Sequence, residues 1–104
     1  MMSKVSEVKS YLLRIELLHT HRPIWREVWV PSDLTLDLLH EVIQCVMGWD
    51  DDHMHGFEFQ KQRFQPLEFI DGFDDDAGKS EELVELGELL KRARQKLTYT
   101  YDFG

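Results

Sequence analysis

Alternating apolar and polar positions near the start of the chain predict two strands. Residues 11–18 (YLLRIELL) and 24–30 (IWREVWV) both alternate with a period of two, which is typical of strands. The link at 19–23 is polar and contains a proline, so it favours a turn. We therefore expect an antiparallel pair that ends at Pro31, because proline cannot donate to a sheet.

Between Thr35 and Gly48 the apolar positions recur with the period of a helix instead. At about 100° per residue they fill one arc, and Gln44 falls on the opposite arc with the polar residues. His40 lies at the boundary of the arcs, one turn before Gln44. Thr35 suits the N-cap, and Gly48 lies where a left-handed residue ends a helix. The apolar arc consists of Leu36, Leu38, Leu39, Val42, Ile43, Val46 and Met47.

The second half of the chain predicts two strands, a helix and a closing strand. Residues 53–60 and 97–103 alternate as strands do, and 67–70 suits a short strand between them. Residues 80–95 suit a helix, with Ser80 as N-cap, acids in the first turn and basic residues near the end. Its expected buried stripe is Leu83, Leu86, Leu90, Ala93 and Leu97.

This order, ββαββαβ, indicates an α+β fold. A mixed, largely antiparallel sheet would pack on helices in a layout similar to the ubiquitin-like β-grasp. A chain of 104 residues suffices for one domain. We assign residues 11–104 to this domain and 1–10 to a flexible N-terminal tail. A shared layout by itself carries no function.

The net charge of the chain limits the classes of molecule that we expect it to bind. The net charge is −8, and residues 49–104 contribute most of it, with seven Lys/Arg against fourteen Asp/Glu. Such a surface repels phosphate backbones, so nucleic acid is not an expected partner. No apolar run approaches the roughly 20 residues that span a bilayer. The absence of a signal peptide and the single Cys45 predict a cytoplasmic protein.

The acids and histidines after the predicted helix are candidate metal ligands. His53 and His55 are spaced to point the same way from a strand, and Asp50 or Asp52 could complete a site for a divalent metal. His40 from the helix is a possible extra ligand. Alternatively, both histidines extend the stripe of Phe57, and the acids are solvated. No cofactor is otherwise implied, and phosphate-loop, dinucleotide and serine-nucleophile fingerprints are absent from the sequence.

Two further groups are candidate binding residues. His40 with Gln44 could orient a ligand, or His40 could be a buried, hydrogen-bonded structural residue. Trp25 and Trp29 share one face of their predicted strand, and the opposite face is also apolar. This pattern fits either a core on both sides or a surface for a protein partner or a second copy. Trp49 and Phe57 complete the candidate binding set.

A set of residues in the order of a known protein family runs through most of the chain: Pro23-Ile24-Trp25-Arg26, Val30-Pro31, Thr35-Leu36, Leu39-His40, Ile43-Gln44, Met47-Gly48-Trp49, Asp52, His53, His55, Phe57 and Tyr101-Asp102-Phe103-Gly104. On these residues the sequence resembles the plasmid pRiA4b ORF-3-like family. The resemblance implies a link to mobile elements, because some members are insertion-sequence passengers. Members continue past the last motif with a further strand, so it also implies that this chain lacks the C-terminal strand and leaves a sheet edge open.

These observations favour a small cytosolic binding or assembly module, with Trp25, Trp29 and Phe57 in contact with a protein partner or in a homodimer. An alternative is a metal-binding protein or metal-dependent enzyme centred on His53 and His55. A second alternative, a recombination accessory factor, follows from the family resemblance and is opposed by the acidic charge. Whether the protein is an enzyme stays open, because no nucleophile is evident.

Overall fold

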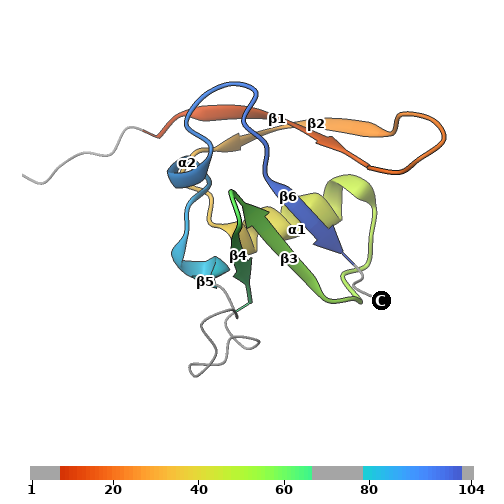
Figure 1. The fold of residues 1–104 in the computed structure, drawn as a ribbon. Coiled ribbons are helices and arrows are strands. Elements are labelled where there is room, and N and C mark those ends of the chain that lie inside the picture. Colours follow the sequence, from red (N-terminus) through yellow and green to blue (C-terminus); the bar gives the residue numbers. More distant parts are fainter. Residues whose placement is uncertain (1–7, 67–78, 102–104) are drawn as a thin grey trace, which may run out of the picture.

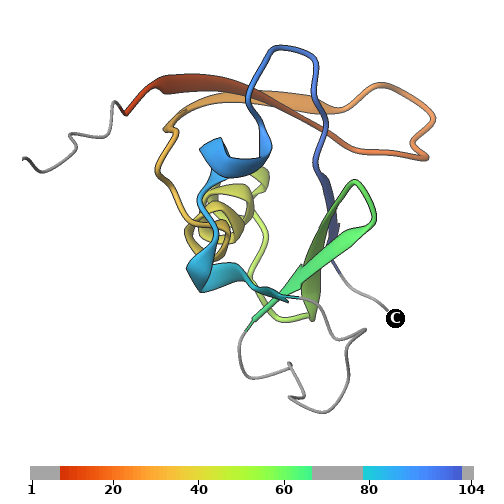
Figure 2. The same ribbon diagram turned by 60° about the vertical axis from the view of Figure 1, so that its left-hand side comes forward.

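A central helix organises the structure. The computed structural model describes residues 8–66 and 79–101. Helix α1 (Leu36–Met47) lies beneath a hairpin and beside a four-stranded sheet, as its end-on view in Figure 2 shows. The buried apolar residues come from every one of these parts, so the core forms where they meet. It consists of Val30, Leu36, Leu39, Ile43, Phe57, Phe64 and Leu86.

The predicted hairpin is confirmed. Strands β1 (Ser10–Glu16) and β2 (Trp25–Pro31) pair antiparallel across the top of the molecule (Figure 1). Their register joins Ser10 to Pro31, so β1 begins inside the segment that the sequence assigned to the tail. Only the face that carries Tyr11, Leu13 and Val30 packs against the core. The opposite face is exposed, which rules out a core on both sides of the hairpin among the described residues.

Helix α1 has the predicted bounds, with Thr35 as N-cap and Gly48 in the left-handed conformation (φ 73°). The predicted arcs are partly wrong. Gln44, expected on the polar side, is 5% exposed, whereas the apolar Leu38 is 50% exposed. The helix turns His40 and Gln44 toward the sheet, where they form hydrogen bonds with polar groups of other segments. The periodicity of the helix alone could not reveal those partners.

The second sheet has the order β5-β4-β3-β6. Strand β3 (His55–Phe59) pairs antiparallel with β4 (Gln62–Gln65) and β6 (Thr98–Tyr101), and β4 pairs parallel with β5 (Lys79–Ser80). The sequence did not predict β4, since its turn uses Gln60 and Lys61 at positive φ in place of the usual Asn or Gly. The strand predicted at 67–70 lies outside the described residues.

The prediction of a helix at 80–95 is wrong. After β5 the chain forms a short 3-10 helix, η3 (Glu81–Leu83), and one turn of helix, α2 (Leu86–Leu89). The backbone between them is extended because it hydrogen-bonds the segment before α1: Leu36 N donates to Val84 O, and Leu86 N donates to Leu34 O. Leu83, expected in the buried stripe, is 80% exposed.

The structure is therefore α+β, as predicted. The hairpin forms a sheet of its own in the described residues, so the expected single mixed sheet does not form there and the β-grasp arrangement is not confirmed. Within the described ranges, no helix has the length and apolar character needed to cross a membrane.

Candidate functional site

A hollow of about 630 Å³ lies between α1, the loop after it and η3. Among the described residues, its lining holds three histidines and no lysine or arginine. The carboxylates outnumber every other type of side chain, which gives the hollow a strongly negative field that favours cations. They are Asp37, Glu41, Asp51, Asp52, Glu81 and Glu82.

His40 forms one wall of the hollow and is held on both ring nitrogens. Nδ1 lies 2.7 Å from the Tyr99 hydroxyl, and Nε2 lies 2.7 Å from Oδ1 of Asp51. Gln44 completes a closed ring of hydrogen bonds. Its Nε2 donates to the Tyr99 hydroxyl (3.0 Å), and its Oε1 accepts from the backbone N–H of Asp51 (2.8 Å).

The Gln44 amide donates to the Tyr99 oxygen. The directions of the two bonds at His40 depend on its tautomer: with the proton of the neutral ring on Nε2, this nitrogen donates to Asp51 and Nδ1 accepts the Tyr99 proton. Asp51 holds a left-handed conformation (φ 54°), which a short acidic side chain tolerates and which the bond to Gln44 stabilises. The sequence expectation that His40 is buried and hydrogen-bonded agrees with this arrangement.

Burial raises the pKa of the Tyr99 hydroxyl. The nearby carboxylates of Asp51 and Glu81 act in the same direction, while the hydrogen bond from Gln44 opposes them. The phenol therefore keeps its proton across the physiological range and remains a donor to His40.

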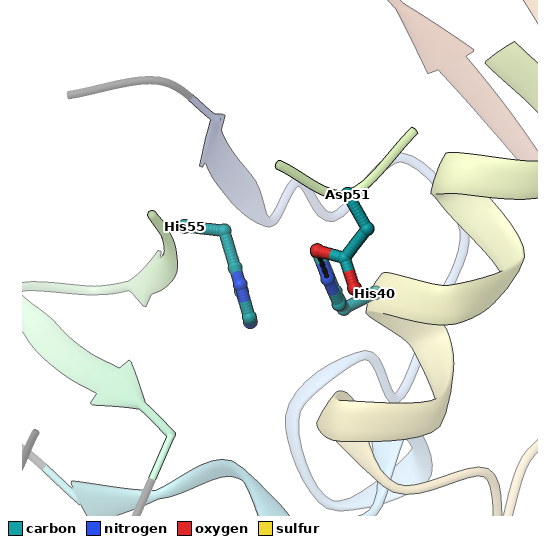
Figure 3. Close-up of side chains that lie close together, drawn as sticks. All are labelled: His40, Asp51 and His55. Atoms are coloured by element: carbon teal, nitrogen blue, oxygen red, sulfur yellow. Dashed lines mark hydrogen bonds and ion pairs between the residues drawn. The ribbon is translucent and has the colours of Figure 1, made fainter. Parts of the chain in front are cut away.

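His55 lies on the opposite wall, at the start of β3. Its ring stacks on that of His40 with centroids 3.5 Å apart and planes within 7° (Figure 3). His55 Nε2 donates to Oε1 of Glu81 at 2.9 Å. Glu81 is 1% exposed, and its second oxygen, Oε2, has no hydrogen-bond partner among the described residues. A buried carboxylate oxygen left in this way is uncommon and calls for an explanation.

Three of these side chains could share a metal ion. One ligand atom each from His40, Asp51 and His55 lies within 4.8 Å of the others. Imidazole nitrogens bind in the plane of the ring at about 2.0–2.1 Å. Two parallel rings 3.5 Å apart cannot both aim at one ion in this way, so at least one ring must tilt when an ion binds.

The structure separates the histidines that the sequence placed together. His53 precedes β3, is half-exposed and lies 3.3 Å from Oδ1 of Asp52, which also accepts a bond from the Tyr101 hydroxyl. Of the ligands predicted from sequence, His55 and the possible extra ligand His40 lie in the three-residue cluster, and His53 does not. Asp50 and Asp52 are exposed outside it, and Asp51 takes the place predicted for them.

The structure also places the candidate binding residues in different environments. Trp25 and Trp29 are exposed on the hairpin, while Phe57 is 3% exposed and belongs to the core, so it cannot contact a partner. Trp49 is half-buried and stacks on Tyr101. His40 and Gln44 lie in the site as proposed, but as part of its buried frame.

Sequence reasoning missed Glu81 and Tyr99. Glu81 was assigned to the exposed first turn of a helix, and nothing in its neighbourhood along the chain marks it as buried. Tyr99 lies in the segment 97–103 that the alternating pattern predicts as a strand, but its contact with α1 joins residues 59 positions apart in the chain.

These features define an α+β domain with a histidine–carboxylate pocket between its helix and its sheet. The chain belongs to the plasmid pRiA4b ORF-3-like protein family, whose sequence pattern matches residues 9–104. It is 31% identical over 94 residues to the uncharacterized protein y4hQ of Sinorhizobium fredii (strain NBRC 101917 / NGR234), a match that covers 88% of this chain and 46% of that protein.

The fold is similar to the crystal structure of a protein of unknown function, MM3350, from Methanosarcina mazei Go1. The TM-score is 0.76 with 31% sequence identity, over 95% of this chain and 55% of the other. The chain thus spans about half the length of the relatives it matches.

Proposed function

We propose that the protein binds a divalent metal ion through His40, Asp51 and His55. The observation that carries this proposal is the approach of their ligand atoms to within 4.8 Å of one another, beside a buried Glu81 whose Oε2 has no hydrogen-bond partner among residues 8–66 and 79–101. Two neutral imidazoles and the carboxylates of Asp51 and Glu81 would balance the charge of such an ion.

The donor set narrows the class of metal. Mixed imidazole and carboxylate ligands suit zinc, iron, nickel or manganese better than calcium or magnesium, which prefer oxygen ligands throughout. Glu81 would orient His55 through Oε1, as carboxylates beside metal-bound histidines commonly do. Three protein ligands at the side of an open hollow leave coordination positions free, which is typical of catalytic sites.

The charge of the hollow supports a cation over the alternative of a recombination factor. In the part of the chain that the structure describes, six carboxylates and no lysine or arginine line the hollow, and this charge would repel a nucleic-acid backbone. The binding or assembly function expected from the tryptophans would lie on a different surface, the outer face of the hairpin, so the two functions can be tested separately.

The test is a calorimetric titration of metal-stripped protein with zinc, manganese, iron(II) and nickel. We expect one ion per chain, and a loss of affinity of more than about a hundredfold in His55→Ala, since even indirect ligand supports cost up to that much. His53→Ala is the matched control, because this histidine lies on the same segment but outside the cluster, and it should bind as the wild type does.

Two results would overturn the proposal: no binding of any of these ions by the wild type, or equal losses in the two variants. Thermal melts in chelator establish that both variants are folded. Melts with added metal give a second measure, because a ligand that binds only the native state raises its stability.

A further inference from the structure

The outer face of the hairpin carries large apolar side chains in water. Trp29 is 66% exposed, Leu12 47% and Trp25 43%. They occupy the positions that alternate with the core-facing residues of β1 and β2, so they cannot turn inward without a shift of register that would expose the core. An exposed group of this kind marks an interaction surface.

The register of the hairpin arranges this face in rows. Leu12 lies opposite Trp29, Arg14 opposite Glu27, and Glu16 opposite Trp25. The guanidinium of Arg14 also lies 4.3 Å from the centroid of the Trp25 ring. In the first two rows each strand thus presents an apolar residue and then a charge, with opposite charges on the two strands, whereas in the third row β1 presents Glu16 and β2 presents Trp25.

We propose that a second copy of the chain covers this face in a symmetric dimer. A two-fold axis in the interface, parallel to the strands, places β1 of one copy over β2 of the other. Leu12 then faces the partner's Trp29, and Arg14 faces the partner's Glu27. Each contact occurs twice, as a two-fold interface requires.

Self-complementarity favours a second copy over an unrelated partner. An axis across the strands, midway between the first two rows, would set Arg14 against the partner's Leu12 and Glu27 against the partner's Trp29, and so bury both charges on apolar groups. The axis parallel to the strands sets apolar on apolar and charge on opposite charge in these two rows, and leaves only Glu16 against an apolar residue, the partner's Trp25. Aligned packing of two sheets is also a common way to bury a sheet face. The proposal does not depend on the metal centre.

The experiment is sedimentation velocity over a wide range of concentrations, with chelator present so that a metal-bridged dimer cannot imitate the effect. We expect a monomer–dimer equilibrium in the wild type. Trp29→Glu should raise the dissociation constant by about thirtyfold or more, as loss of a central aromatic anchor does. Leu83→Glu introduces the same charge at another exposed apolar site and should leave the dissociation constant unchanged.

Charge reversal tests the pairing itself. Arg14→Glu and Glu27→Arg should each weaken the dimer, because each sets like charges against one another, and the double variant should recover most of the affinity. A monomer at all concentrations would overturn the proposal. So would a dimer that Leu83→Glu weakens as much as Trp29→Glu, or one that neither charge reversal affects.

Discussion

The two walls of the hollow differ in whether the buried polar groups on them are fully hydrogen-bonded. On the His40 wall, Gln44, Tyr99 and Asp51 form a closed ring in which each hydrogen bond supports the next. On the facing wall, Glu81 is at least as deeply buried as Gln44 and yet leaves Oε2 without a partner in the described residues.

The difference distinguishes side chains that stabilise the structure from side chains that are available to bind a ligand. A satisfied network contributes to stability and fixes a ring in one orientation. A buried carboxylate with an unused oxygen lowers stability, and such groups persist where function requires them. We therefore infer that the ring holds two of the proposed metal ligands, His40 and Asp51, in position, and that the unsatisfied Glu81 beside His55 is retained for the binding of the ion.

The largest difference between the two walls is expected when Gln44 and Glu81 are each replaced by methionine. Gln44→Met removes two hydrogen bonds and should lower the free energy of unfolding by about 2 kcal/mol, at roughly 1 kcal/mol for each bond. Glu81→Met has a similar volume; it removes the hydrogen bond to His55, which costs about 1 kcal/mol, but also removes a buried carboxylate with one unsatisfied oxygen, so the stability of the metal-free protein should change by less than about 1 kcal/mol. Urea denaturation in chelator measures both changes.

The two variants should also differ in metal binding. Glu81→Met should weaken it by about tenfold or more through the loss of the carboxylate that orients His55. If Glu81→Met destabilises the metal-free protein as much as Gln44→Met does, the two walls do not differ in the way described.

Removal of a single oxygen from the ring should have a smaller effect. Tyr99→Phe leaves His40 Nδ1 and Gln44 Nε2 without the hydroxyl, and we expect a loss of about 1–2 kcal/mol in the free energy of unfolding. Tyr101→Phe is the control on the same strand, since its hydroxyl bonds the exposed Asp52 and should cost less. Equal costs for the two substitutions would argue against a special role for the ring.

Local patterns predicted the elements whose contacts are also local. The hairpin and α1 follow from periodicity and from Gly48, because neighbouring residues decide these structures. The helix predicted at 80–95 failed although its charges and leucines suit a helix. Backbone bonds from Val84 and Leu86 to the segment before α1 compete with it, and their partners lie about 50 residues away in the chain.

The candidate site was predicted only in part for the same reason. Its segment was identified, since acids and histidines after a helix are visible in the sequence. The choice among them depends on the left-handed Asp51, which turns its carboxylate toward His40. Glu81 comes from a third segment, and a single glutamate among others carries no mark of burial in the sequence.

The smallest predicted effect is a dependence on alkaline pH. Burial raises the pKa of Tyr99 above its ordinary value of 10.0, so the folded protein holds this proton more tightly than the unfolded chain does. The stability that this hydroxyl contributes is complete below about pH 10 and declines as the pH rises above it.

Tyr99→Phe lacks the titrating group and should not show this decline. The difference in unfolding free energy between wild type and Tyr99→Phe, measured by denaturant titration at a series of pH values, should therefore shrink above pH 10. A difference that stays constant would mean that the hydroxyl is not held in the ring as a proton donor.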